Sequence, residues 1–208
     1  NALGPRNLSI ASRECKARLI HVSTDYVFPG DGSVPYTEFD EPCPKSVYGR
    51  TKLAGERMVQ ELAERYSIIR TAWLYGDGKN FVKTMLRLSA THDEVSVVDD
   101  QLGNPTSTAE LARAIHDLMD TDNYGLFHGT CEGITSWANF TEEIFSVAGV
   151  GTSVKHVSTK EYAAMTPQSA PRPAYSALDN MMLRMTNGYR FSDWHDAIKE
   201  YIKTFDLT

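Results

Sequence analysis

The fold of this chain is decided by two stretches, Ser23-Thr24-Asp25-Tyr26-Val27-Phe28 and Tyr48-Gly49-Arg50-Thr51-Lys52. The first grows out of an apolar run, Leu19–Ser23, that is typical of a buried strand. The second lies near the start of a helix predicted from about residue 46 to residue 65. Residues 29–44 between them are rich in Gly, Pro and Asp, which is the composition of a loop. A strand, a loop and a helix therefore follow one another, as in a βαβ unit.

The remainder of the chain continues this alternation. Further strands are predicted at residues 67–71, 94–98 and 126–128, and further helices at residues 81–90, 108–119, 137–148 and 194–205. The opening residues 1–8 also have the pattern of a helix start, and Ser136 is placed to cap the helix that follows it. Alternating strands and helices predict an α/β fold with a mainly parallel sheet.

The composition argues against several classes of protein. The 208 residues carry a net charge of −6, which is unsuited to a broad nucleic-acid-binding face. The three cysteines are odd in number and show no CxxC spacing, so we expect neither a disulfide framework nor a zinc site. This cysteine usage favours a reducing compartment, the cytoplasm. We expect no membrane partner, because no apolar run approaches the length of a membrane span, and the acidic residues show no spacing for a metal.

Tyr48 and Lys52 are one helical turn apart on the same face of the predicted helix. A free tyrosine has a pKa of about 10, which is too high for efficient proton transfer at neutral pH. A neighbouring ammonium group and the positive end of a helix both favour the phenolate. The pair is therefore a candidate for general acid–base chemistry, although Tyr-x-x-x-Lys alone occurs by chance on many helices.

Thr24 strengthens this interpretation because it follows a predicted buried strand. In open α/β sheets, ligands bind beyond the carboxyl ends of the strands. A hydroxyl group at that place can donate to a substrate carbonyl as negative charge develops on it. Taken alone, Ser23 and Thr24 are equally well explained as the end of a strand and the start of a turn.

The motifs taken together resemble those of a known family. Residues 19–56, with Ser-Thr-Asp-Tyr-Val-Phe and Tyr-Gly-Arg-Thr-Lys-Leu-Ala-Gly-Glu, are similar to the extended short-chain dehydrogenase/reductases. Within these, the chain most resembles the dTDP-4-dehydrorhamnose reductase family. The resemblance continues through residues 70–76, 79–81, 100–106 and 172–179, in the family's order, and so covers nearly the whole chain.

This resemblance implies a reaction and a set of site residues. Thr24, Tyr48 and Lys52 match the family's catalytic trio, which reduces the C4 keto group of a nucleotide-linked 4-keto-6-deoxy sugar with NADPH or NADH. Tyr48 and Lys52 would also bind the cofactor at its nicotinamide ribose. The residues expected to contact the nucleotide-sugar substrate are Thr24, Asp25, Trp73, Asn104 and Arg172. By residue type alone, Trp73 fits a core position, Arg172 a loop charge and Asn104 a turn.

The resemblance also implies that part of the family's fold is absent. Family members begin with a strand, a glycine-rich turn and several βα units, whereas Gly76-Asp77-Gly78, the nearest match here, lacks the third glycine. We therefore expect a partial Rossmann-like parallel sheet whose first strand leaves an open edge that favours association. Residues 1–75 would be the end of the dinucleotide-binding domain, and residues 76–208 mostly a substrate-binding lobe with returning Rossmann elements. Alone, this chain should bind cofactor weakly.

Two other functions stay open from the sequence. The first is a related nucleotide-sugar dehydratase or epimerase, but dehydratases of this superfamily usually carry an acid where Tyr26 stands. The second is a non-catalytic subunit, because the regulatory subunit of methionine adenosyltransferase resembles these reductases. The intact trio argues mildly against that role. The sequence leaves association into a homo-oligomer undecided.

Overall fold

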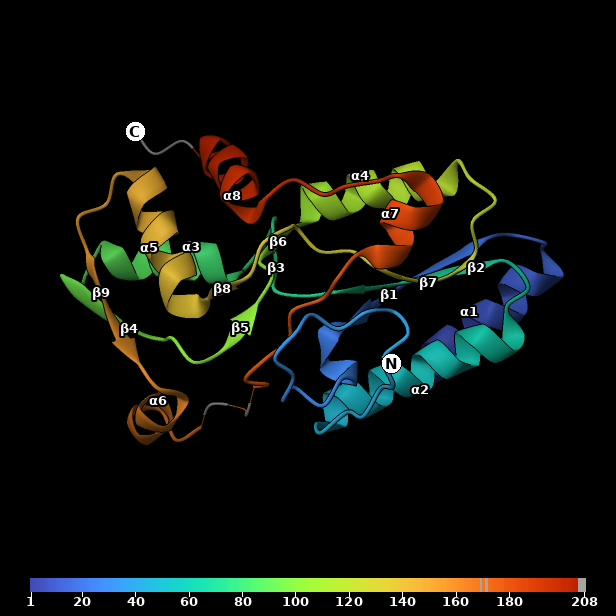
Figure 1. The fold of residues 1–208 in the computed structure, drawn as a ribbon, viewed down its shortest axis with the longest axis horizontal. Coiled ribbons are helices and arrows are strands. Elements are labelled where there is room, and N and C mark those ends of the chain that lie inside the picture. Colours follow the sequence, from blue (N-terminus) through green and yellow to red (C-terminus); the bar gives the residue numbers. More distant parts are fainter. Residues whose placement is uncertain (169, 171, 206–208) are drawn as a thin grey trace.

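The computed structural model describes residues 1–168, 170 and 172–205. A three-stranded parallel sheet, with strands from the first and middle parts of the chain, organises one region of the fold (Figure 1). Its strands are β1 (Leu19–Thr24), β2 (Tyr66–Thr71) and β7 (Gly125–His128), and they lie in the order β1-β2-β7. Among the described strands β1 is therefore at an edge of this sheet, as the sequence predicts. The three strands end at the same edge because all of them run in one direction.

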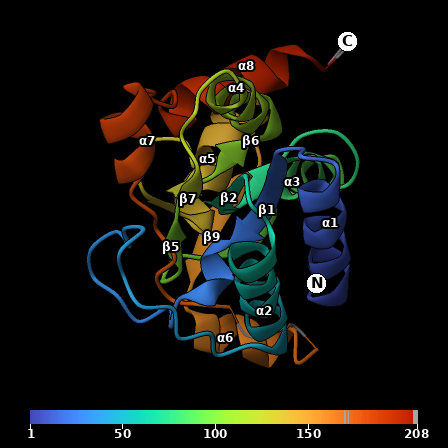
Figure 2. The same cartoon turned by 90° about the vertical axis from the view of Figure 1, so that its right-hand side faces the viewer.

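Helices cover both faces of this sheet. α1 (Leu3–Glu14) packs on α2 (Val47–Leu62), and both contact β1 from one side. α4 (Thr108–Met119) and α7 (Met181–Asn187) lie on the other side, above the sheet in Figure 1. Figure 2 shows α2 and α4 on opposite sides of β1 and β2. The arrangement is the helix–sheet–helix layering expected of an α/β fold.

A second region is built around another parallel pair of strands. These are β4 (Glu94–Val98) and β9 (Ser153–Val157). Its helices are α3 (Phe81–Ser89), α5 (Trp137–Ala148), α6 (Thr159–Met165) and α8 (Trp194–Lys203). α5 packs on α3, α8, β4 and β9, so it is the central element of this region.

Short elements connect the two regions. The two-residue strands β3 (Leu74–Tyr75) and β6 (Thr106–Ser107) pair in parallel, whereas β5 (Leu102–Gly103) and β8 (Thr135–Ser136) pair in antiparallel fashion. A turn of 3-10 helix, η1 (Asp25–Val27), follows β1 directly.

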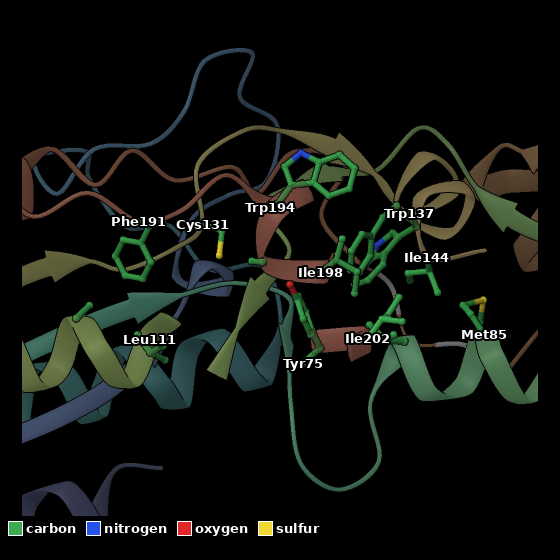
Figure 3. Close-up of a cluster of buried hydrophobic side chains, with 14 of the residues drawn as sticks. Tyr75, Met85, Leu111, Cys131, Trp137, Ile144, Phe191, Trp194, Ile198 and Ile202 are labelled. Carbon is green, nitrogen blue, oxygen red and sulfur yellow. The ribbon is translucent and has the colours of Figure 1, made fainter. Parts of the chain in front are cut away.

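The largest hydrophobic cluster spans both regions. It contains Ile69 and Phe127 from the three-stranded sheet together with side chains of α4, α5 and α8. Figure 3 shows part of it, where Trp137, Ile198 and Ile202 gather around the same space. Because one continuous core joins strands of the three-stranded sheet to helices of the second region, the two regions stabilise each other.

Local sequence signals explain where several helices begin. The Ser46 hydroxyl accepts a hydrogen bond from Gly49 N at 3.0 Å, and the Ser136 hydroxyl accepts one from Asn139 N at 3.1 Å. Each satisfies one of the backbone N–H groups that the first turn of a helix leaves unpaired. α5 ends at Gly149, which has a φ of 67°, a left-handed conformation that glycine adopts without strain.

Most of the expected elements match the structure. The α/β class with parallel strands is confirmed, and β4, α4 and α5 have the predicted bounds. The sequence did not predict β9, α6 and α7, nor the 3-10 turn η1 and the two-residue strands β3, β5, β6 and β8. None of the helices in the described part of the chain is long and apolar enough to cross a membrane. Within the same residues, no group of three or more His, Cys, Asp or Glu side chains is placed to hold a metal ion.

Candidate active site

The end of β1 carries two buried polar side chains. The Thr24 hydroxyl donates to Asp25 Oδ1 at 2.8 Å and accepts from Tyr26 N at 3.2 Å. Thr24 therefore caps η1, and the turn that it starts places Asp25 next to it. A strand end followed by a tight turn fixes both side chains at the edge where an α/β sheet binds ligands.

Asp25 is held in an environment that favours its protonated form. Burial raises the pKa of Asp25 to about 6, and its hydrogen bonds with the hydroxyls of Thr24 and Ser176 oppose that rise only in part. Its second oxygen, Oδ2, is buried and has no hydrogen-bond partner in this structure. A carboxyl group of this kind changes its protonation state near neutral pH.

The first turn of α2 lies directly against η1. A Cβ atom on Gly49 would be 2.1 Å from the carbonyl oxygen of Tyr26, so only glycine permits this approach. The Tyr48 ring meets the Tyr26 ring edge-on, with 5.6 Å between their centroids and an interplanar angle of 79°. Tyr48 is nevertheless 48% exposed. Its phenol is therefore available to a bound molecule.

Lys52 lies one turn further along the same face of α2. Its ammonium donates to the carbonyl oxygen of Val22 at 2.6 Å. Burial lowers the pKa of Lys52, and the carboxylate of Glu56 opposes this change. Tyr48 contacts the residue two positions after Thr24, while Lys52 bonds the residue two positions before it. The predicted trio is thus gathered around the carboxyl end of β1.

Trp73 stands in an unusual backbone conformation just after β2. Its φ is 47°, in the left-handed region that is unfavourable for a residue with a side chain. The indole ring stacks on that of Trp137, with 3.5 Å between centroids and 6° between planes, and its Nε1 donates to the Ser176 hydroxyl at 3.2 Å. A Cβ atom on Gly103 would be 2.6 Å from the Trp73 indole. Several contacts therefore fix this ring.

Arg172 lies beside Trp137. Its guanidinium is 5.4 Å from the centroid of the Trp137 ring, within cation–π range. Burial raises the pKa of Tyr26, and the positive charge of Arg172 opposes that rise. The structure thus brings Asp25, Trp73 and Arg172 into one region with the trio.

Asn104 has a different environment from the other candidates. It is buried; its Nδ2 donates to Gly133 O at 2.6 Å, and its Oδ1 accepts from Leu178 N at 2.8 Å. Both ends of the side-chain amide are therefore engaged by main-chain groups that it holds together. The hydrogen bonds found for it go to none of the other candidate residues, and its role in substrate binding stays a prediction.

Sequence reasoning assigned no site role to four residues that support this region. Trp137 and Ser176 hold the Trp73 ring, while Glu56 and Arg70 form a buried ion pair with Nη2–Oε2 at 2.7 Å. Glu56 and Arg70 could have been identified from the sequence, because a charged residue within an apolar helix face or a buried strand usually has a partner of opposite charge. Trp137 and Ser176 had no such signal, because their partners are distant in the sequence.

The residues present fit one end of a nicotinamide cofactor. The phenol of Tyr48 and the ammonium of Lys52 offer donors side by side at the strand end, which suits the ribose next to the nicotinamide. The sequence offers no glycine-rich turn for the pyrophosphate. Two surface hollows, of about 590 and 380 Å³, lie elsewhere, at α5–α8 and at residues 42–57, and neither is lined by Thr24, Tyr48 or Lys52.

Comparison with known proteins agrees with the resemblance seen in the sequence. Residues 1–207 match the family described as RmlD substrate binding domain. The chain is 41% identical to dTDP-4-dehydrorhamnose reductase from Mycobacterium tuberculosis over 95% of its length, and it spans 66% of that protein.

Solved structures give the same result. A dTDP-4-dehydrorhamnose reductase from Clostridium acetobutylicum is 51% identical, with a TM-score of 0.94 over 98% of this chain and 71% of that one. The enzyme from Bacillus anthracis, solved in complex with NADP, is 42% identical, also with a TM-score of 0.94, over 99% of this chain and 72% of that one. The chain therefore belongs to the RmlD family, and within it to the dTDP-4-dehydrorhamnose reductases.

Proposed function

We propose that this chain takes part in the reduction of a dTDP-4-keto-6-deoxy sugar, converting dTDP-4-dehydrorhamnose to dTDP-L-rhamnose. NADPH or NADH is the reductant. The observation that carries this proposal is the placement of Thr24, Tyr48 and Lys52 around the end of β1, in a chain of this family. The B. anthracis relative in complex with NADP supports a nicotinamide cofactor.

The reaction assigns a separate task to each member of the trio. The cofactor, when bound, supplies the hydride. Tyr48 gives its phenolic proton to the oxygen that the reduction leaves on C4, and Lys52 beside it favours the resulting phenolate. Thr24 donates to the same oxygen. A hydroxyl has only one proton, so Thr24 must turn from Asp25 Oδ1 toward the substrate to do this.

The other candidates bind the substrate in this proposal. Trp73 presents an indole whose far face already rests on Trp137, and Asp25 offers carboxyl oxygens to sugar hydroxyls. The guanidinium of Arg172 suits the diphosphate, because its planar set of donors matches phosphate oxygens. Asn104 is kept as a weaker candidate.

The proposal also covers the division of the chain, its cell compartment and its binding partners. The division at residue 75 assigns the trio to the dinucleotide-binding part, and residues 76–208 mostly to the substrate side. We place the protein in the cytoplasm, because its three cysteines are free. Its partner is a nucleotide sugar, with no nucleic acid or membrane, and association into a homo-oligomer is a further expectation.

The test measures NADPH consumption by the complete protein with dTDP-4-dehydrorhamnose, compared with NADH. Tyr48→Phe should lower kcat by about 10²–10⁴-fold with little change in KM, because only the proton donor is lost. Tyr124→Phe is the matched control, since Tyr124 is also partly exposed but lies against Arg18. Equal activity of the wild type and Tyr48→Phe would refute the role of Tyr48, and an inactive wild type would refute the reaction.

A further inference from the structure

Helix α2 is joined to the sheet by charged side chains in the interior. Glu56 and Arg70 are 1% and 2% exposed. Arg70 donates from Nη2 to Glu56 Oε2 at 2.7 Å and from Nε to Glu56 Oε1 at 3.0 Å. The Ser23 hydroxyl donates to the same Oε1 atom. One carboxylate therefore connects α2 to β1 and to β2 at the same time.

Glu56 lies on the same side of α2 as the candidate catalytic residues. Tyr48, Lys52 and Glu56 follow one another at four-residue steps, so they share one face of α2. Lys52 bonds Val22 and Glu56 bonds Ser23, which are the two residues directly before Thr24. A rotation of α2 about its axis, or a shift along β1, would break both connections.

The pairing of β1 with β2 also places Arg70 close to Ser23 and Thr24. Ser23 of β1 lies opposite Arg70 of β2, and Thr24 lies opposite Thr71. Arg70 is therefore fixed one residue away from the strand end at which the trio meets. Its guanidinium also lies 5.0 Å from the centroid of the Phe28 ring, just beyond η1.

Stability alone does not explain a charged pair at this place. Replacing a buried ion pair with apolar residues of similar volume is often neutral or stabilising, because the desolvation of both charges is avoided. The ion pair instead fixes an orientation, because two N–H···O bonds from one guanidinium hold the carboxylate in one position. Apolar contacts between α2 and the sheet would hold the helix with less exact rotation.

We propose that Glu56, held by Arg70 and Ser23, is a positioning residue that fixes the rotation and register of α2, so that Tyr48 and Lys52 face the strand end at Thr24. The inference rests on the proposed function for the reaction that these residues serve. Glu56 also acts on the charge of Lys52, since its carboxylate opposes the lowering of the Lys52 pKa by burial. Two further titratable groups are near Lys52: the Tyr48 phenol one turn away on α2, and His21 of β1, whose pKa the charge of Lys52 helps to lower.

The first experiment removes both charges together, so that no unpaired charge is left in the interior. In the complete protein, Glu56→Gln with Arg70→Met should fold, yet kcat should fall about 10–100-fold, because small misplacements of catalytic groups are costly. The KM for the nucleotide sugar should change by less than about threefold. A folded double variant with wild-type kcat would overturn the inference.

The second experiment uses two buried serines of the same sheet. Ser23→Ala removes a hydroxyl that holds Glu56, whereas Ser67→Ala removes one that accepts a hydrogen bond from Arg18 at 2.8 Å. We expect kcat to fall about 3–10-fold in Ser23→Ala and to stay unchanged in Ser67→Ala. Equal kcat values in both variants would contradict a positioning role for the Glu56 contacts, even if the double variant does not fold.

A third measurement does not depend on the reaction. The titration of Lys52, followed by NMR of its labelled side chain, should move to lower pH in the double variant and stay unchanged in Ser67→Ala. The displacement supports the inference even if the wild-type protein reduces no nucleotide sugar, so the two proposals can fail separately. An unchanged Lys52 titration would show that Glu56 does not act on this face of α2.

Discussion

The two sides of the candidate site are held in place by different kinds of interaction. On the side of α2, Glu56 forms directional hydrogen bonds with Arg70 and Ser23 in the interior. On the opposite side, Trp73 and Trp137, here called the tryptophan pair, are held by ring stacking. Proton transfer requires exact distances, which charge-assisted hydrogen bonds define. A binding surface needs area and shape, which stacked rings provide at little entropic cost.

The largest expected effect comes from breaking the ion pair that holds α2. Arg70→Met alone leaves the Glu56 carboxylate buried without its partner, and should cost about 3–5 kcal/mol of unfolding free energy. The control is Arg184→Met, which breaks the Arg184–Asp179 ion pair, whose side chains are 26% and 33% exposed. That variant should cost less than about 1 kcal/mol. Urea unfolding measures both, and similar costs would remove the contrast between a buried and a partly exposed pair.

The next prediction concerns Asp25 and pH. Folding raises the pKa of this carboxyl to about 6, so the folded state binds the proton more tightly than the unfolded state. The contribution of Asp25 to stability is therefore fully present below its unfolded pKa and is lost as pH rises through about 6, about 3 kcal/mol in total. Asp25→Asn should remove this loss, so the variant gains stability relative to the wild type between pH 4 and pH 7.

Asp40 is the control of opposite sign. Its hydrogen bonds with the main chain and side chain of Thr37 lower its pKa, so its contribution is present above the unfolded pKa and is lost as pH falls. Asp40→Asn should therefore lose stability at neutral pH and approach the wild type in acid. Parallel pH–stability curves for wild type and Asp25→Asn would contradict the environment described for Asp25.

A smaller effect tests the contact between α2 and η1. Gly49→Ala places a methyl group against the Tyr26 carbonyl, so it should cost about 1–3 kcal/mol and also lower kcat. Gly4→Ala in α1 is the matched change, because nothing lies within 4 Å of its added Cβ. It should stabilise the protein by about 0.5–1 kcal/mol, as alanine is the better helix former. Thermal unfolding distinguishes them, and two stabilised variants would mean that α2 is not pressed against η1.

The smallest effect tests the tryptophan pair. A double-mutant cycle with Trp73→Leu and Trp137→Leu should give a coupling energy of about 0.5–1.5 kcal/mol from ring stacking. In the complete protein, Trp73→Leu should raise the KM for the nucleotide sugar more than it lowers kcat. Additive effects on stability would mean that the two rings do not stabilise each other, and a loss confined to kcat would contradict a binding role for Trp73.

Local signals account for the parts of the fold that the sequence predicts. The bounds of α4, α5 and β4 follow from helix caps and apolar runs, which need no knowledge of distant residues. β9 was missed because its side chains are mostly exposed, so it lacks an apolar run. α6 buries none of its residues and is also outside that pattern. Its capping box, Ser158 with Glu161, was a signal that could have identified it.

The same distinction applies to the candidate site. Thr24, Tyr48 and Lys52 were found because they lie in short motifs whose spacing reports a strand end and a helix face. Trp137 and Ser176 could not be found in this way, since they contact Trp73 from 64 and 103 positions away in the chain. Contacts of that range depend on how the two regions pack.

The backbone at Trp73 has a consequence for attempts to improve this protein. A glycine would adopt the φ of 47° without strain, whereas a tryptophan there carries a cost of order 1–3 kcal/mol. Replacing the indole would relieve this strain but would also remove its stacking on Trp137, so the two effects on stability oppose each other. Selection for heat resistance alone would respond to these two effects and not to the sugar-nucleotide binding proposed for Trp73, so selection at this position must include turnover.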